Sequence, residues 1–122
     1  MALQSHYSFD MFKLVFFVPE PQAEEVKTAV FRAGAGHYRL YDSCAWQTLG
    51  TGQFRPMPDS NPFIGTAGHI ERVPELRVEV LCRDEQVRPA LRALLEAHPY
   101  EEPAYEVYQV WQLPDLPQDI PH

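Results

Sequence analysis

The sequence predicts an α+β domain in which two helices cover one face of a four-stranded antiparallel sheet. Two segments carry apolar residues at helical spacing, and four segments are rich in β-branched and aromatic residues. Their order along the chain is β-α-β-β-α-β, which is the split βαβ or ferredoxin-like arrangement. The length of 122 residues fits one domain, which buries roughly two-thirds of the surface that the unfolded chain exposes.

The first strand and the first helix follow one another directly. The segment FKLVFFV (12–18) has the composition of a strand, and Pro19 ends it. The next segment, 21–36, is predicted to be helical, with Pro21 in its first turn and Gly34 at its C-terminal cap. Its helical spacing is formed by Ala23, Val26, Ala29, Val30 and Ala33.

The second and third strands are predicted at 40–49 and 70–82. The third strand alternates apolar and charged residues, which is typical of a strand with two different faces. Pro74 cannot donate a ladder hydrogen bond, so it indicates a bulge, a strand start or a sheet edge. The alternating apolar residues are Leu76, Val78 and Val80.

The second helix is predicted at 84–98 and the last strand at 104–113. If Asp84 caps the helix, Pro89 lies deep inside it, where proline removes a hydrogen bond. We therefore expect the regular helix to begin nearer Arg88.

The chain is expected to have three parts. Residues 1–11 show no usable period and are interpreted as a flexible N-terminal extension. Residues 12–113 form the ferredoxin-like domain. Residues 114–122 are rich in proline and are expected to form an irregular tail.

Charge and cysteine content exclude several classes of protein. The chain has 10 Lys and Arg against 17 Asp and Glu, and it has no basic cluster, so it is not expected to bind nucleic acid. It has no long apolar span, so no membrane partner is expected. Cys44 and Cys82 are too few for a secreted disulfide scaffold. We interpret the protein as cytoplasmic with reduced thiols.

The sheet face that the helices do not cover is also predicted to be apolar. In the first strand Val15 and Phe17 lie on the opposite face of the sheet from Leu14. In the last strand Tyr108 and Val110 are also predicted to lie on this second face. An exposed apolar face indicates a partner, and the simplest partner is another copy in a closed symmetric assembly. The alternative is that the terminal extensions cover this face.

A long connection without evident structure, GTGQFRPMPDSNPFIGTAGH (50–69), follows the second strand. Connections of this length inside a compact domain are usually functional or disordered. Its glycines and prolines indicate a shaped loop, and the amides of a glycine-rich turn can bind an anion. The segment lacks the Walker A lysine and the dinucleotide fingerprint, so the phosphate signal is weak. Packing against a neighbouring subunit explains the loop equally well.

The segment AHPYEEPAYEVY (97–108) presents two interpretations of one corner. His98 with Glu101 or Glu102 offers nitrogen and oxygen ligands for a divalent metal, if a second subunit supplies more. His69, at the mouth of the long connection, is a further candidate ligand.

The structural interpretation gives every residue of this corner a role. His98 satisfies the last carbonyls of its helix, and Pro99 stops that helix. Tyr100 buries its ring while its hydroxyl reaches the backbone, and Pro103 starts the last strand.

Two further groups of reactive side chains have simple structural interpretations. Cys44 lies in the middle of the predicted second strand and is interpreted as a small buried apolar residue rather than a nucleophile. Glu71, Glu75 and Glu79 share a strand face with Arg77, which indicates an ion-paired surface.

Four segments together carry a family resemblance. They are GAG (34–36), YDSCAWQTLGTGQFRP (41–56), NPFIGTAGHIERVPELRVEV (61–80) and AHPYEEPAY (97–105). With these segments the chain resembles, over residues 12–113, a stand-alone form of the YqfO-type insert of Nif-three-like proteins. HYRL at 37–40 departs from the family pattern, which usually has glycine and asparagine before the tyrosine.

The resemblance implies a fold similar to that of PII and CutA proteins, which assemble as trimers. PII-like proteins bind nucleotides and other small effectors between subunits with a loop in the position of 50–69. CutA-like proteins are linked to divalent metal tolerance. Full-length Nif-three-like proteins hold a two-metal centre in the flanking domains, and its ligands have no counterparts in this chain.

The resulting prediction is a non-catalytic homotrimer that binds a small effector or a divalent metal ion at subunit interfaces. The alternatives are a small metal-dependent hydrolase and a pure protein-interaction scaffold. The predicted metal ligands are His98, Glu101, Glu102 and His69. The predicted effector-binding residues are Tyr41, Gly50, Gly52, Gln53, Phe54, Gly65 and Gly68.

Overall fold

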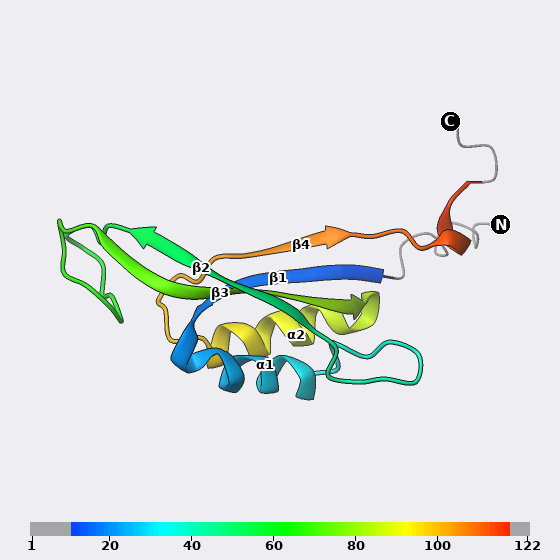
Figure 1. Cartoon of the computed structure of the whole chain (residues 1–122). Coiled ribbons are helices and arrows are strands. Elements are labelled where there is room, and N and C mark those ends of the chain that lie inside the picture. Colours follow the sequence, from blue (N-terminus) through cyan, green and yellow to red (C-terminus); the bar gives the residue numbers. More distant parts are fainter. Residues whose placement is uncertain (1–10, 118–122) are drawn as a thin grey trace.

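The computed structural model describes residues 11–117 and confirms the predicted fold class. A four-stranded antiparallel sheet has the order β2-β3-β1-β4, and both helices lie on one side of it (Figure 1). The regular elements are β1 (Met11–Pro19), α1 (Ala23–Arg32), β2 (Trp46–Phe54), β3 (Glu71–Arg83), α2 (Asp84–Ala97) and β4 (Tyr105–Gln109). Two short 3₁₀ helices, η2 (Glu20–Gln22) and η3 (Leu113–Asp115), precede α1 and follow β4. The terminal segments 1–10 and 118–122, on which part of the predicted extension and tail falls, lie outside the described residues.

The core lies between the helices and the two central strands. One face of β1 and β3 packs against the apolar sides of α1 and α2, where side chains are nearly inaccessible to solvent. Burial of each large apolar side chain contributes about 1.5–3 kcal/mol, so this layer is the main source of stability. Its largest fully buried members are Phe16, Val18, Val26, Val30, Val78, Val80 and Leu94.

The second strand begins later than the predicted 40–49. Leu40 and Tyr41, predicted to lie in it, are 95% and 71% exposed in the connection before β2. Arg39 and Ser43 both have φ of +56°, a left-handed conformation that turns the chain and is incompatible with a strand. The strand instead continues through the glycine-rich GTGQF, so the long connection is shortened to residues 55–70.

Both internal prolines sit where their missing N–H is tolerated. In β3, Pro74 pairs with Thr51 of β2 and lies just beyond Glu75, the last residue paired with β1, so β3 has a neighbour on only one side there. The α2 helix begins at Asp84, not near Arg88, and it contains Pro89.

Solvent explains how α2 accommodates its proline. Pro89 and Glu85, whose carbonyl loses its helical partner, are both exposed, so water can reach that carbonyl.

No helix among residues 11–117 is long and apolar enough to cross a membrane.

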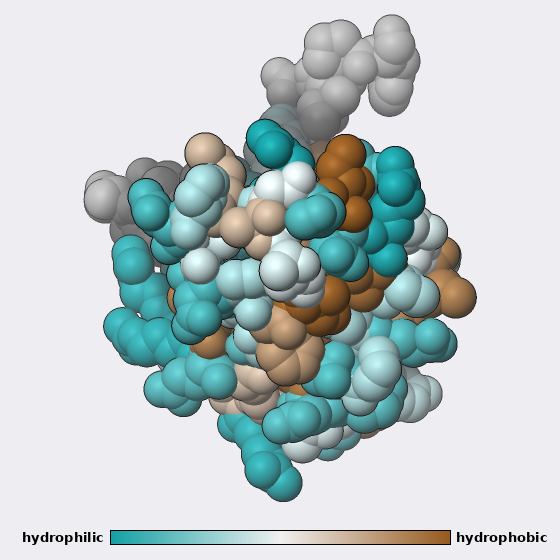
Figure 2. Space-filling model, turned by 90° about the vertical axis from the view of Figure 1, so that its left-hand side faces the viewer, coloured by the Kyte–Doolittle hydropathy of each residue, from teal (hydrophilic) through white to brown (hydrophobic). Residues whose placement is uncertain are grey.

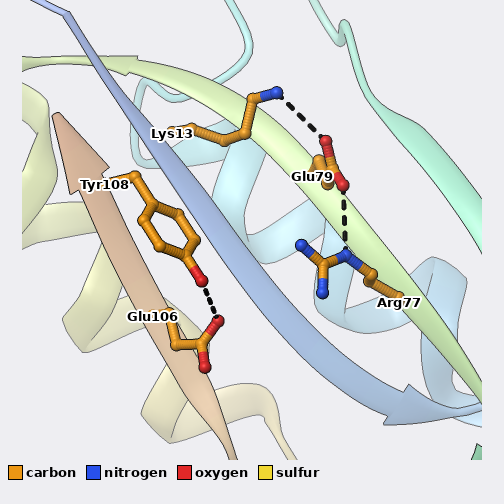
Figure 3. A network of polar contacts seen from close by, with 5 residues as sticks. All are labelled: Lys13, Arg77, Glu79, Glu106 and Tyr108. Carbon is orange, nitrogen blue, oxygen red and sulfur yellow. Dashed lines mark hydrogen bonds and ion pairs between the residues drawn. The ribbon is translucent and has the colours of Figure 1, made fainter. Parts of the chain in front are cut away.

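The sheet face opposite the helices differs from the predicted apolar face. Lys13 and Arg77 both bond Glu79, at 3.1 Å each, and their proximity lowers the pKa of Glu79 (Figure 3). On β4, the hydroxyl of Tyr108 donates to Glu106 at 2.6 Å. This face is therefore a mixture of charged pairs and apolar residues, and it does not by itself require a partner.

Both edge strands carry exposed apolar side chains. On β2, Trp46 and Leu49 are 59% and 57% exposed, and all five residues of β4 are exposed. Because β2 and β4 are the two edges of the sheet, each also has one unpaired side.

Candidate functional site

The candidate site is a cavity of about 560 Å³ at one end of the sheet. It is formed where residues 55–70, the long loop between β2 and β3, meet residues 98–104, the corner between α2 and β4 (Figure 1). Figure 2 looks at this end and shows apolar surface bordered by hydrophilic surface. The volume is within the range of roughly 300–1,000 Å³ that small-molecule sites occupy.

His98 fixes the corner to the central sheet. Its Nε2 lies 2.6 Å from the carbonyl oxygen of Phe17 on β1, and the backbone N–H of Tyr100 donates to its Nδ1 at 3.1 Å. The two contacts fit a neutral imidazole, with the proton on Nε2. Burial lowers the pKa of His98, although the Phe17 carbonyl and Glu75 oppose that shift. The imidazole of His98 therefore bonds β1, and not the last carbonyls of its own helix as predicted, although the backbone N–H of His98 donates to the Leu94 carbonyl at 2.9 Å.

Tyr100 is held by a carboxylate, which corrects the prediction that its hydroxyl reaches the backbone. Its hydroxyl donates to Glu75 on β3 at 3.0 Å, and burial together with this hydrogen bond raises the pKa of Tyr100. Gly52 on β2 leaves the space for that carboxylate, since a Cβ at this position would lie 2.1 Å from Glu75 Oε1. One strand pair thus positions the hydroxyl end of Tyr100.

Three aromatic rings line the cavity around Tyr100. Phe54, at the end of β2, meets Tyr100 edge-on at 5.7 Å between ring centroids. Phe63, from the long loop, lies 6.4 Å from Tyr100 with its plane tilted by 53°. Phe17 of β1 also lines the cavity. The long loop, the corner and two strands therefore contribute aromatic side chains to the lining of the cavity.

The long loop is attached to the corner and closed upon itself by hydrogen bonds. The backbone N–H of Asn61 donates to the Glu101 carboxylate at 3.0 Å. The backbone N–H of Gly68 donates to the Pro56 carbonyl at 2.8 Å, and Gly68 has φ of +85°. Gly65 has φ of +94°, and a Cβ there would lie 2.5 Å from Glu71. The prediction of a shaped loop agrees with this geometry.

The structure brings together only part of the predicted effector-binding set. Gln53 and Phe54 line the cavity, and Gly52 lies beneath Glu75. Gly50 is paired within β2 with open space around its Cα. Tyr41 is on the connection between α1 and β2, at the opposite end of the molecule from the long loop (Figure 1).

The remaining glycines of that set shape the long loop, and they are absent from the residues that line the cavity. The main residues that the sequence did not indicate as effector-binding are Asp59, Phe63, Glu75 and Tyr100. The available signals were the long loop for Asp59 and Phe63 and the motif HPYEE for Tyr100, whereas Glu75 lies in β3 and had neither signal.

The four predicted metal ligands have different local roles. His98 uses both ring nitrogens within the chain, and Glu101 bonds the long loop. His69 is exposed and contacts the Ala67 carbonyl through Nδ1 at 3.2 Å. Among residues 11–117, no three His, Cys, Asp or Glu side chains converge in a way that would hold a metal ion. Metal binding remains a prediction that needs ligands from another chain.

The two cysteines lie away from the cavity. Cys82 is buried in the core, and burial with the nearby Glu85 raises the pKa of its thiol to about 11. Cys44 is partly exposed in the connection before β2, not within a strand, and its Sγ lies 3.7 Å from the Asp42 carbonyl. A thiol with a raised pKa is a poor nucleophile, so Cys82 is a structural residue.

Comparison of the sequence with known proteins places this chain within longer relatives. No protein-family model matches it. A GTP cyclohydrolase 1 type 2 homolog of Halalkalibacterium halodurans is 44% identical over 98 residues, which are 80% of this chain and 26% of that protein. The chain thus spans about a quarter of the curated relative it matches.

Solved structures give the same relationship and the fold. A Bacillus cereus protein related to NIF3 superposes with a TM-score of 0.72 at 41% identity, covering 85% of this chain and 26% of that one. CutA from Xylella fastidiosa superposes with a TM-score of 0.63 at 22% identity, covering 87% and 89% of the two chains. The chain is therefore homologous to the inserted region of the NIF3-related GTP cyclohydrolase 1 type 2 homologs, and it has a CutA- and PII-like fold.

Proposed function

We propose that this chain is a non-catalytic homotrimeric module that binds a small effector in the cavity between the long loop and the corner. The observation that carries this proposal is the exposure of apolar side chains along both edges of the sheet. Trp46 and Leu49 on β2 and Tyr105, Val107 and Tyr108 on β4 are each at least 37% exposed. Edge strands with this composition favour association with another strand.

The two exposed edges are formed by different strands, β2 and β4, which favours a closed ring of subunits. If β2 of one copy meets β4 of the next, the contact is head-to-tail, and such contacts close into rings when the rotation permits. The resemblance to PII and CutA proteins supports three subunits. Residues of the neighbouring copy would then lie close to the end of β2, where the cavity begins.

The effector role is supported by the construction of the cavity. Tyr100 is fixed at its backbone by His98 and at its hydroxyl by Glu75, and Glu101 fixes the loop opposite. A wall held at several points loses little conformational entropy on binding, which favours a small ligand.

The test uses a charge placed on one edge. Val107→Lys on β4 is expected to convert the assembly to single chains, because a lysine on an edge strand prevents pairing. Sedimentation velocity measures the change in mass. Leu95→Lys, on the exposed part of α2 at 45% exposure, is the matched control and should leave the assembly intact.

Two outcomes would contradict the proposed assembly. One is an unchanged mass for Val107→Lys in a chain that remains folded by circular dichroism. The other is equal dissociation of Val107→Lys and Leu95→Lys, since the effect would then not be specific to the edge strand.

A further inference from the structure

We propose that the ligand of the cavity is a small organic cation, such as a quaternary ammonium or guanidinium group. This inference rests on the proposed effector role of the cavity and identifies the chemical class of the effector. It follows from the charge of the lining residues, from their aromatic surface and from the way in which the carboxylates are spread.

The cavity is strongly acidic. Four carboxylates line it against one guanidinium, that of Arg55. None of the five groups takes part in an ion pair among residues 11–117, where the ion pairs found are Lys13–Glu79, Lys27–Glu24 and Arg77–Glu79. The cavity therefore has an excess of negative charge that no ion pair within the described part of the chain neutralises. The four carboxylates belong to Asp59, Glu75, Glu101 and Glu102.

The aromatic wall adds a second feature that suits a cation. Phe54 and Phe63 approach Tyr100 from the strand end and from the long loop, with interplanar angles of 61° and 53°. Rings that are inclined to one another present faces in different directions, and the face of an aromatic ring attracts an organic cation. The hydrogen bond from Tyr100 to Glu75 places a carboxylate next to this wall.

Other ligand classes fit this cavity less well. The carboxylates do not converge, since no group of three suited to a metal ion is found among residues 11–117. A metal ion needs several oxygens within about 2.0–2.6 Å, whereas a diffuse organic cation is stabilised by charges spread around it. A nucleotide phosphate would face four carboxylates and one arginine, which opposes its binding. The same surroundings favour a cation with an apolar body.

The binding test compares probes of nearly equal shape and different charge. Choline is titrated into the full chain by isothermal calorimetry, beside its neutral carbon analogue 3,3-dimethylbutan-1-ol, AMP and MgCl₂. Choline should bind at least about tenfold more tightly than the neutral analogue, because the attraction to ring faces and carboxylates requires the charge. Its affinity should fall as the salt concentration rises.

The variants remove charge or ring surface without breaking the contacts that hold the site. Glu102→Gln and Asp59→Asn alter carboxylates that take part in no ion pair among the described residues, and each should weaken choline binding by roughly five- to tenfold. Phe63→Leu should reduce the preference for choline over the neutral analogue. Glu96→Gln, an equal change of charge on the exposed side of α2 away from the cavity, is the control and should change nothing.

Several results would overturn this inference. They are equal affinity for choline and its neutral analogue, tighter binding of AMP or Mg²⁺, or an equal loss in Glu102→Gln and Glu96→Gln. The mass of each sample is measured alongside. A trimer that binds AMP and not choline would refute the cation while keeping the proposed function, and a single chain that binds no probe would refute both.

Discussion

The central strands of this sheet bury most of their apolar side chains, whereas the edge strands leave most of theirs exposed. On β1, Leu14 and Phe16 are 2% and 0% exposed, whereas their cross-strand partners on β4, Val107 and Tyr105, are 37% and 39% exposed. Both pairs lie on the same face of the sheet, because directly paired residues share a face. A single chain therefore buries the apolar side chains of its central strands but leaves those of its edge strands exposed.

This difference separates two kinds of stability. Residues of β1 and β3 that contact the helices are needed for the chain to fold, since they form its only large cluster of buried side chains within residues 11–117. Residues of β2 and β4 contribute less to that folding, and their apolar surface is available for association. Substitutions in the two sets should therefore be distinguishable by experiment.

The largest effect is expected at the centre of the sheet. Phe16→Ala removes a fully buried ring and should lower the free energy of unfolding by about 3–5 kcal/mol. Urea unfolding followed by circular dichroism measures this loss. Tyr105→Ala, opposite Phe16 on β4, should instead leave the chain folded and shift the assembly toward lower mass at dilute concentration. Similar losses of folding stability in both variants would contradict the distinction between centre and edge.

A smaller effect is expected where the corner is fixed to the central strand. His98→Leu leaves the Phe17 carbonyl and the Tyr100 N–H without their partner. An unsatisfied buried group costs about 1–3 kcal/mol, so the free energy of unfolding should fall by at least that amount. Urea unfolding at pH 7.5 provides the measurement.

The same residue predicts a dependence on pH. Burial lowers the pKa of His98 below its ordinary 6.5. Just below pH 6.5, His98 is therefore protonated in the unfolded chain while it is still neutral in the folded chain. The contribution of neutral His98 to the free energy of unfolding should therefore be fully present above pH 6.5. It should fall as the pH decreases from 6.5 toward the pKa of His98 in the folded chain, by up to about 1.4 kcal/mol per pH unit. His98→Leu should remove this slope and His37→Gln, an exposed control, should keep it. An unchanged slope in His98→Leu would assign it to other groups.

The smallest effect on stability is expected within the edge strand β2. Gly52→Ala displaces the Glu75 carboxylate, which is flexible, so the loss should stay below about 1 kcal/mol. The displacement removes the hydrogen bond of Tyr100, and the pKa of Tyr100 should then move down toward 10.0. Tyrosinate absorbance during alkaline titration detects the change. Gly50→Ala, which meets nothing within 4 Å, is the matched control, and an identical titration curve for both variants would contradict the role of Gly52.

The fold was largely predictable because β1, β3 and both helices carry strong apolar periodicity. The bounds of the second strand could not be predicted, because it is an edge strand whose burial pattern does not alternate. Its glycines resemble a loop, and its position is set by pairing with β3, as in Gly52 with Val73, which only the folded sheet reveals. Leu40 and Tyr41 have strand composition but are followed and preceded by left-handed residues.

The candidate site was predictable only in outline. The long loop and the HPYEE corner both stand out in the sequence, and Gln53 and Phe54 of the predicted set line the cavity, while effector binding by them stays a prediction. Their meeting was not foreseen, because Asn61 and Glu101 are 40 residues apart and no periodicity links them. The role of Glu75 was also missed, since its pattern matched that of Glu79, which does form ion pairs.

The central claim is that the exposed edge strands β2 and β4 pair with the edge strands of neighbouring copies of the chain. Sedimentation equilibrium of the unmodified chain over a wide range of concentration tests this claim most directly. We predict a single species with three times the 14.1 kDa mass of one chain. A species of 14.1 kDa at every concentration would contradict the claim.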